Sequence, residues 1–127
     1  MITWLDKICY PLEHPKYPQI KKRLVLYGRD GKIIGKCAEG EIACQNKLPI
    51  DSDGEGTLNP EDFIKLGVPE DLARYGCLPY LSEMFDFDRW SEINGCIGEY
   101  IVSMNDTLDF TESEIAEFLR TTFEDAV

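Results

Sequence analysis

The sequence predicts an α+β fold, namely a single and predominantly helical domain of 127 residues with one β-hairpin near its N-terminus. Two observations predict this class. Capping residues precede apolar residues at helical spacing in several places along the chain. Only one pair of apolar segments, 23–27 and 32–36, is joined by a short turn rich in glycine and aspartate, which is typical of a hairpin. A chain of this length can bury a core without disulfides.

The N-terminal part is expected to form a short helix and then the hairpin. Thr3 can cap the helix, and Pro11 is expected to stop it because proline has no N–H to donate within a helix. The connection from Pro11 to Pro18 is expected to be extended. Residues 28–31 then form the hairpin turn, in which a glycine after an aspartate can adopt positive φ.

A central helix is predicted over residues 37–46, which are mostly small. Cys37, Gly40 and Cys44 recur at a spacing that places them on one helix face, where they would let a neighbouring backbone approach closely. Pro49 is expected to prevent its continuation.

Three further helices are predicted in the second half of the chain. Asn59 followed by Pro60 is a strong start signal. Apolar residues recur at helical spacing from Asp88 to Met104, and residues 111–114 form a capping box before the last helix. The buried side of that last helix is predicted to consist of Ile115, Phe118, Leu119 and Phe123.

The charge is divided unevenly along the chain. Residues 1–36 carry a balance of +5 and residues 37–127 a balance of −16, which together give the net charge of −11. The domain is therefore expected to consist of a basic helix and hairpin segment packed on an acidic helical body. Because a nucleic-acid binder needs the opposite balance, no direct contact with nucleic acid is expected, and a basic protein surface is the expected partner.

Location and cofactors are predicted from what the composition lacks. No apolar run is long enough to span a membrane, and residues 1–6 do not resemble a signal peptide. The five cysteines are widely spaced and there is one histidine, so the sequence predicts a reduced, cytoplasmic protein with no cofactor. The oligomeric state is left open.

Residues 51–62 resemble a calcium-binding EF-hand loop. Acidic side chains stand at positions one, three, five and twelve, and Gly56 stands at position six, where the loop must turn sharply. Pro49 interrupts the incoming helix, however, and an acidic turn before the Asn59 cap explains most of the same residues. No metal is expected, and a divalent-metal module stays as an alternative with these ligands: Asp51, Asp53, Glu55 and Asp62.

A second alternative is a cysteine-dependent enzyme that uses Cys37. Nucleophilic catalysis needs a thiolate and a positioned base, and His14 is the only imidazole in the chain. Cysteines among apolar residues usually behave as small buried side chains, so a protein without catalytic activity is expected.

Residues 78–90 combine large apolar side chains with acids, which is typical either of a recognition surface for a basic partner or of a core segment. The outer face of the last helix adds further acids. The predicted partner-binding residues are Glu83, Phe85, Asp86, Asp88, Trp90, Glu112, Glu117 and Glu124.

Several short motifs occur in an order that resembles a group of small uncharacterised proteins encoded by bacteriophages and bacteria. The motifs are Lys16–Gln19, Gly35–Ala43, Leu58–Glu61, Met104–Asp106 and Phe110–Ala116.

The resemblance covers roughly residues 16–120, and it departs from the group at Glu39 and Glu41, where apolar residues are usual. It implies a phage-encoded protein that acts in a host cytoplasm. Together with the charge, it leads us to expect a small acidic interaction protein that inhibits a host defence or nucleic-acid-binding protein through an acidic surface.

Overall fold

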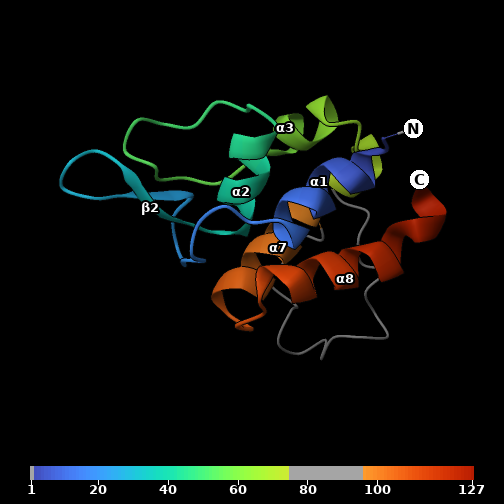
Figure 1. The fold of residues 1–127 in the computed structure, drawn as a ribbon. Coiled ribbons are helices and arrows are strands. Elements are labelled where there is room, and N and C mark those ends of the chain that lie inside the picture. Colours follow the sequence, from blue (N-terminus) through green and yellow to red (C-terminus); the bar gives the residue numbers. More distant parts are fainter. Residues whose placement is uncertain (1, 75–95) are drawn as a thin grey trace.

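The computed structural model describes residues 2–74 and 96–127, and it confirms the α+β fold with one antiparallel hairpin near the N-terminus (Figure 1). Within these ranges no helix combines the length and the apolar character that crossing a membrane requires. The elements, in chain order, are α1 (Trp4–Glu13), β1 (Val25–Tyr27), β2 (Ile33–Lys36), α2 (Ala38–Gln45), α3 (Pro60–Lys65), α4 (Glu70–Arg74), α7 (Ile97–Asp106), α8 (Glu112–Phe123) and the short 3₁₀ helix η1 (Glu124–Ala126).

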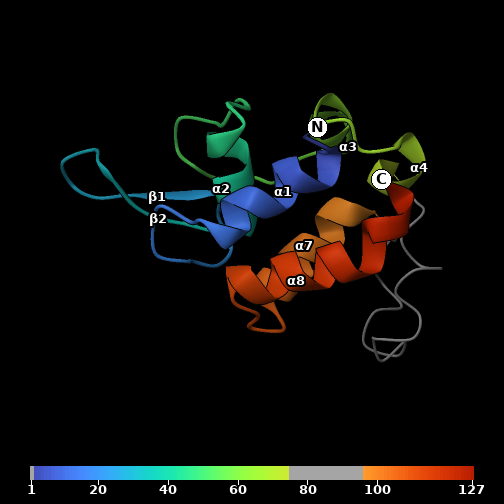
Figure 2. The same ribbon diagram turned by 45° about the vertical axis from the view of Figure 1, so that its right-hand side comes forward.

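The first and last helices pack along each other, as Figures 1 and 2 show. Trp4 on α1 meets Phe123 on α8 edge to face, with ring centroids 6.1 Å apart. The guanidinium of Arg120 on α8 pairs with Asp6 at 2.9 Å and with Glu13 at 2.7 Å, both on α1. One apolar core joins α1, α2, α7 and α8, so the basic N-terminal segment and the acidic body form a single domain.

Helix α1 continues through Pro11, so the predicted stop near this residue is wrong. Proline lacks the N–H that would bond to the carbonyl of Lys7. The side-chain amide of Asn46 donates to that carbonyl at 2.8 Å instead. Since the freed acceptor has a partner from another helix, the proline is tolerated inside the helix.

The hairpin lies against the first turn of α2. Strands β1 and β2 are antiparallel, with an irregularity in register between Leu26 and Tyr27, and Gly31 in the turn has φ of 80°. A Cβ atom on Gly40 would lie 1.9 Å from the carbonyl oxygen of Leu24, which means that only glycine allows this approach. The small residues predicted for the central helix therefore serve close packing.

The three predicted caps are confirmed. Thr3, Asn59 and Thr111 each accept a bond from the third helical backbone N–H, and the acid at that third position bonds back to the cap. The expected beginning of the helix before Met104, at Asp88, lies outside the described residues; the described part begins at Ile97.

Candidate functional site

Helix α2 carries two buried glutamates in its first turn, Glu39 and Glu41, which are 1 % and 0 % exposed. The sequence alone marks them only as acids in a helix of small residues. Cys37 caps the start of the helix, and its sulfur accepts from the N–H of Gly40. The side-chain oxygen of Asn105 on α7 accepts from the N–H of Ala38 at 3.0 Å. These caps fix the first turn between the hairpin and α7.

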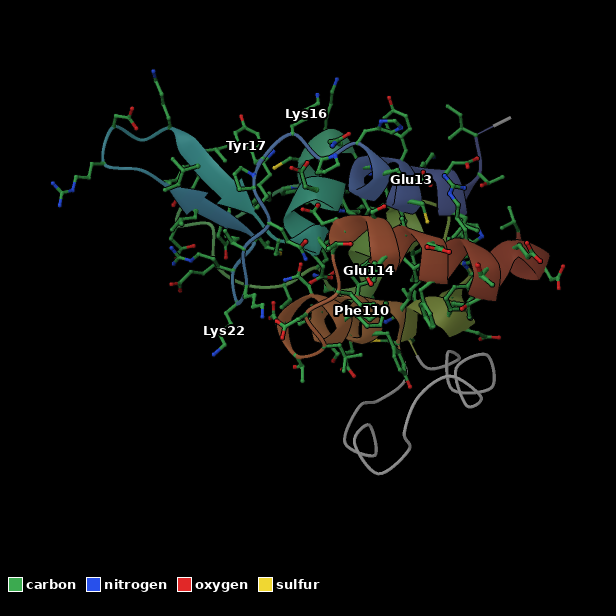
Figure 3. All side chains as sticks on the ribbon, turned by 60° about the horizontal axis from the view of Figure 1, so that its bottom comes forward. Glu13, Lys16, Tyr17, Lys22, Phe110 and Glu114 are labelled. Atoms are coloured by element: carbon green, nitrogen blue, oxygen red, sulfur yellow. The ribbon has the colours of Figure 1, made fainter. Side chains whose placement is uncertain are left out.

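Glu41 is fully bonded. Its Oε1 accepts from the backbone N–H groups of Lys16 and Tyr17, each at 3.0 Å, and its Oε2 accepts from the side-chain amide of Gln45 at 3.0 Å. Figure 3 shows Lys16 and Tyr17 on the connection that follows α1. The carboxylate therefore holds this connection, which has no regular structure of its own, against α2.

Glu39 is bonded at one oxygen only. Its Oε1 accepts from the N–H of Leu58 at 3.3 Å, whereas Oε2 is buried without a partner. Burial raises the pKa of this carboxyl well above its ordinary value; the Leu58 N–H opposes the rise, and the charges of Asp106 and Asp62 add to it. Burial therefore disfavours the charged form of the Glu39 carboxyl.

A cavity of about 580 Å³ lies beside Glu39. A Cβ atom on Gly98, which lines the same cavity, would lie 3.4 Å from Oε2 of Glu39, so the unbonded oxygen is on the cavity side of the carboxyl. Cavities that hold small ligands are usually about 300–1,000 Å³ in volume. The described lining includes the apolar side chains of Leu58, Phe63 and Val102 and the hydroxyls of Thr57 and Ser103.

A smaller cavity of about 70 Å³ adjoins the same carboxyl. It shares Glu39, Thr57 and Val102 with the larger one and extends towards Cys37 and Asn105. Glu39 therefore borders open space on two sides. An acid in this position can bind a hydrogen-bond donor or change its charge when a ligand arrives.

Glu112 is buried, and its predicted place on the outer face of the last helix is therefore wrong. It is 4 % exposed, and its N–H donates to the side-chain oxygen of Gln19 at 3.1 Å, which draws the start of α8 against the connection after α1. Burial and the charge of Glu41 raise the pKa of Glu112 to about 8, while Lys36 opposes the rise. Its Oε2 has no partner.

The other predicted contacts divide into two groups. Glu117 and Glu124 are exposed on α8 and η1, as expected. The remaining predicted contacts lie outside the described residues: Glu83, Phe85, Asp86, Asp88 and Trp90.

Cys37 and His14, the candidates for nucleophilic catalysis, do not come together. Cys37 is 8 % exposed, and burial raises the pKa of its thiol to about 12, so it carries no thiolate at neutral pH. His14 is exposed at the end of α1, where its ring lies 4.4 Å from that of Tyr10. This environment argues against Cys37 as a nucleophile.

The carboxylates of the 51–62 loop serve local structure. Asp53 accepts from the N–H of Glu55 at 2.9 Å, Glu55 pairs with Arg23 at 2.7 Å, and Asp62 accepts from the N–H of Asn59 at 2.9 Å. They do not converge, and no group of three or more acidic, cysteine or histidine side chains in the described ranges is placed to hold a metal ion.

Gly54, at position four of that loop, has a structural explanation of its own. The carbonyl of Gly54 accepts from the N–H groups of Leu24 and Val25, at 2.9 and 3.1 Å, with φ of 74°. A Cβ atom there would lie 2.2 Å from the carbonyl oxygen of Val25. The loop needs glycine because it docks on the hairpin.

Comparison of the chain with models of protein families, with curated proteins and with solved structures finds no match.

Proposed function

We propose that this chain is a small acidic interaction protein that binds a basic surface of a partner protein. The observation that supports it is the charge along α8 and η1. Glu117 and Glu124 are exposed and have no ion pair within the described part of the chain, and Arg120, the only cation of α8, is already held by Asp6 and Glu13. Among the residues that the structure describes, no cation therefore neutralises the carboxylates of Glu117 and Glu124.

The basic N-terminal segment does not oppose this binding. Lys21 pairs with Asp109, and Arg23 pairs with Glu55. Figure 1 shows the hairpin projecting from the side of the molecule opposite the C-terminal end of α8, and Figure 3 places Lys22 on the hairpin side. A partner with a basic cleft can approach α8 without meeting these cations.

Carboxylates spaced along a helix can occupy the positions that phosphates take on a nucleic-acid-binding protein, and clustered charge speeds the encounter. The proposal is therefore of an inhibitor that occupies the basic surface of a host defence or nucleic-acid-binding protein. The host cytoplasm as the setting follows from the resemblance to phage-encoded proteins. Phe85 and Trp90, with the acids among residues 83–88, are proposed as further contacts.

Capture of partners from host lysate tests this proposal when charge reversal is included. The double variant Glu117→Lys/Glu124→Lys should capture the partner at least about tenfold less, and wild-type capture should be lost between about 50 mM and about 500 mM salt. The matched control is Asp51→Lys/Asp53→Lys, which makes the same change of charge on the loop beside the hairpin. Capture that ignores both salt and the α8 reversal would contradict the proposal.

A captured partner then permits the decisive measurement. The purified chain should displace labelled nucleic acid from the partner, and Glu117→Lys/Glu124→Lys should fail to do so. If the chain and the nucleic acid bind the partner together, the inhibitor is not acting at the nucleic-acid surface.

A further inference from the structure

The carboxyl of Glu39 combines deep burial with an unused bonding position. The residue is 1 % exposed, one oxygen has a single bond to the Leu58 N–H, and the other has none. Buried polar groups in folded proteins nearly always have partners, because an unmet group has lost its bonds to water. The exception here borders a cavity and not a packed wall, so a bound molecule can supply the missing donor.

The charges around the cavity favour a cation. The charges of Asp106 and Asp62 both act on Glu39 and make the potential at its carboxyl more negative. Arg74 is the only cation among the lining residues that the structure describes, and Glu61 and Glu70 hold it at 2.8 and 3.1 Å. An anion would find no available positive group among these residues.

The shape and lining of the cavity suggest the remainder of the molecule. Phe63 and Leu58 offer an apolar wall on the α3 side, and Val102 offers another on α7. Gly98 lets α7 pack closely against this wall, since a Cβ atom there would lie 2.8 Å from the Phe63 ring. An apolar group can therefore occupy the cavity while a polar end reaches the carboxyl.

We propose that the cavity beside Glu39 binds a small organic amine, with its ammonium group donating to the unbonded oxygen of Glu39 and its apolar body against Phe63 and Val102. An ammonium group at this oxygen favours the charged form of Glu39, so binding shifts the carboxyl towards the carboxylate, and the proton that this removes leaves to the solvent. The bound pair is then a charge-assisted hydrogen bond, which is stronger than a neutral one. This site is separate from the acidic surface of α8, so the two proposals stand or fall independently.

Calorimetric titration with 2-phenylethylamine tests the site, with 2-phenylethanol as the neutral analogue of the same shape. The amine should bind the wild-type chain with one site and at least about tenfold more tightly than the alcohol. Repeating the titration at pH 7 in buffers of different ionisation enthalpy should show net release of protons on amine binding.

Two matched variants assign the binding to Glu39. Glu39→Gln keeps the volume and the Oε1 acceptor but cannot become charged, so it should bind the amine at least about tenfold more weakly and release no proton. Glu112→Gln makes the same substitution at a buried carboxyl that is not among the cavity residues, and it should bind as the wild type does.

Three results would overturn the proposal. The first is saturable amine binding that Glu39→Gln leaves unchanged, and the second is equal affinity for the amine and the alcohol. The third is no saturable binding of 2-phenylethylamine, tyramine or putrescine up to about 10 mM, the range in which molecules of this size bind a fitting site. Amide chemical shifts at Leu58 and Gly98 give a second readout, since both should move on binding.

Discussion

Glu39 and Glu41 are two residues apart on the same helix and equally buried, yet their surroundings differ. Glu41 accepts three hydrogen bonds from three different residues. Glu39 accepts one bond, and its second oxygen borders a cavity. Two acids that are equally buried can therefore differ in their bonding: Glu41 joins segments of the fold, whereas Glu39 has one unbonded oxygen beside a cavity.

The difference teaches how to separate a structural acid from a binding one. A buried carboxylate that satisfies backbone donors stabilises the fold, because its removal leaves those donors without partners. A buried carboxyl with an unmet oxygen reduces stability, and it is this oxygen for which an amine ligand is proposed. Four variants test whether the two glutamates differ in this way.

Glu41→Ala should have the largest effect. It leaves the N–H groups of Lys16 and Tyr17 without an acceptor, and it removes a buried charge from the neighbourhood of Lys36 and Glu112. We expect a loss of about 3–5 kcal/mol in the free energy of unfolding, measured by urea denaturation. Glu41→Gln keeps the Oε1 acceptor and should lose less. Equal losses in the two variants would show that the backbone bonds matter little.

Gly40→Ala acts on both glutamates at once, because Gly40 lies between them and sets how closely the hairpin approaches. The new Cβ atom would meet the carbonyl oxygen of Leu24 at 1.9 Å, so the hairpin must move. We expect a loss of about 1–3 kcal/mol in the free energy of unfolding. The perturbation should reach the cavity, so amide shifts at Gly98 should change as well. A variant as stable as the wild type would mean that the hairpin does not rest on α2 in solution.

Glu112→Gln should change the dependence of stability on pH. The ordinary pKa of the carboxyl is 4.5, and in the folded chain it is raised to about 8. Between these values the folded state holds a proton that the unfolded state has lost, so the free energy of unfolding falls as pH rises, by up to about 1.4 kcal/mol for each pH unit from this group. Glu39 acts in the same direction.

The stability of Glu112→Gln relative to the wild type should therefore increase steadily from pH 5 to pH 8. Urea denaturation across that range measures the two free energies of unfolding. Asp6, whose pKa is lowered to about 2, affects stability in the opposite direction. Its contribution to the stability of the fold is present above pH 3.8 and is lost as the pH falls towards 2. If Glu112→Gln and the wild type lose stability in parallel above pH 5, the pKa of Glu112 is not raised.

Glu39→Gln should have the smallest effect on stability. Burial disfavours the charged form of the wild-type side chain, and glutamine keeps the acceptor for Leu58, so we expect a change within about 1 kcal/mol in the free energy of unfolding. Thermal unfolding at pH 7 measures it. A loss as large as that of Glu41→Ala would show that Glu39 too is a structural acid.

The starts of the capped helices can be predicted from the sequence, because capping signals are local. The caps at Thr3, Asn59 and Thr111 act within four residues, so the chain's own neighbours decide them. Pro11 is the informative failure: whether a proline ends a helix depends on whether its freed carbonyl finds a donor, and that donor is Asn46 on a distant helix. No local pattern contains this fact.

The candidate site is less predictable for the same reason. Glu39, Gly98 and Phe63 come from three helices, and their proximity is set by how α2, α3 and α7 pack. One feature of the sequence could have indicated that Glu39 is buried: it is one of two acids in a helix of mostly small residues. Small residues on a helix face imply that neighbouring elements pack closely against it. Glu112 shows the converse, because an acid in the first turn of an exposed-looking helix becomes buried when Gln19 caps it.

The pairing of α1 with α8 also sets when the protein can fold during its synthesis. The apolar side chains of Trp4, Leu5 and Ile8 are covered in part by a helix that follows more than 100 residues later, as the 107-residue separation of Glu13 and Arg120 illustrates. At a synthesis rate of about 5–20 residues per second, that separation is a wait of roughly 5–20 s. During this interval the first helix is a hydrophobic segment without its partner, and a chaperone at the ribosome can bind it.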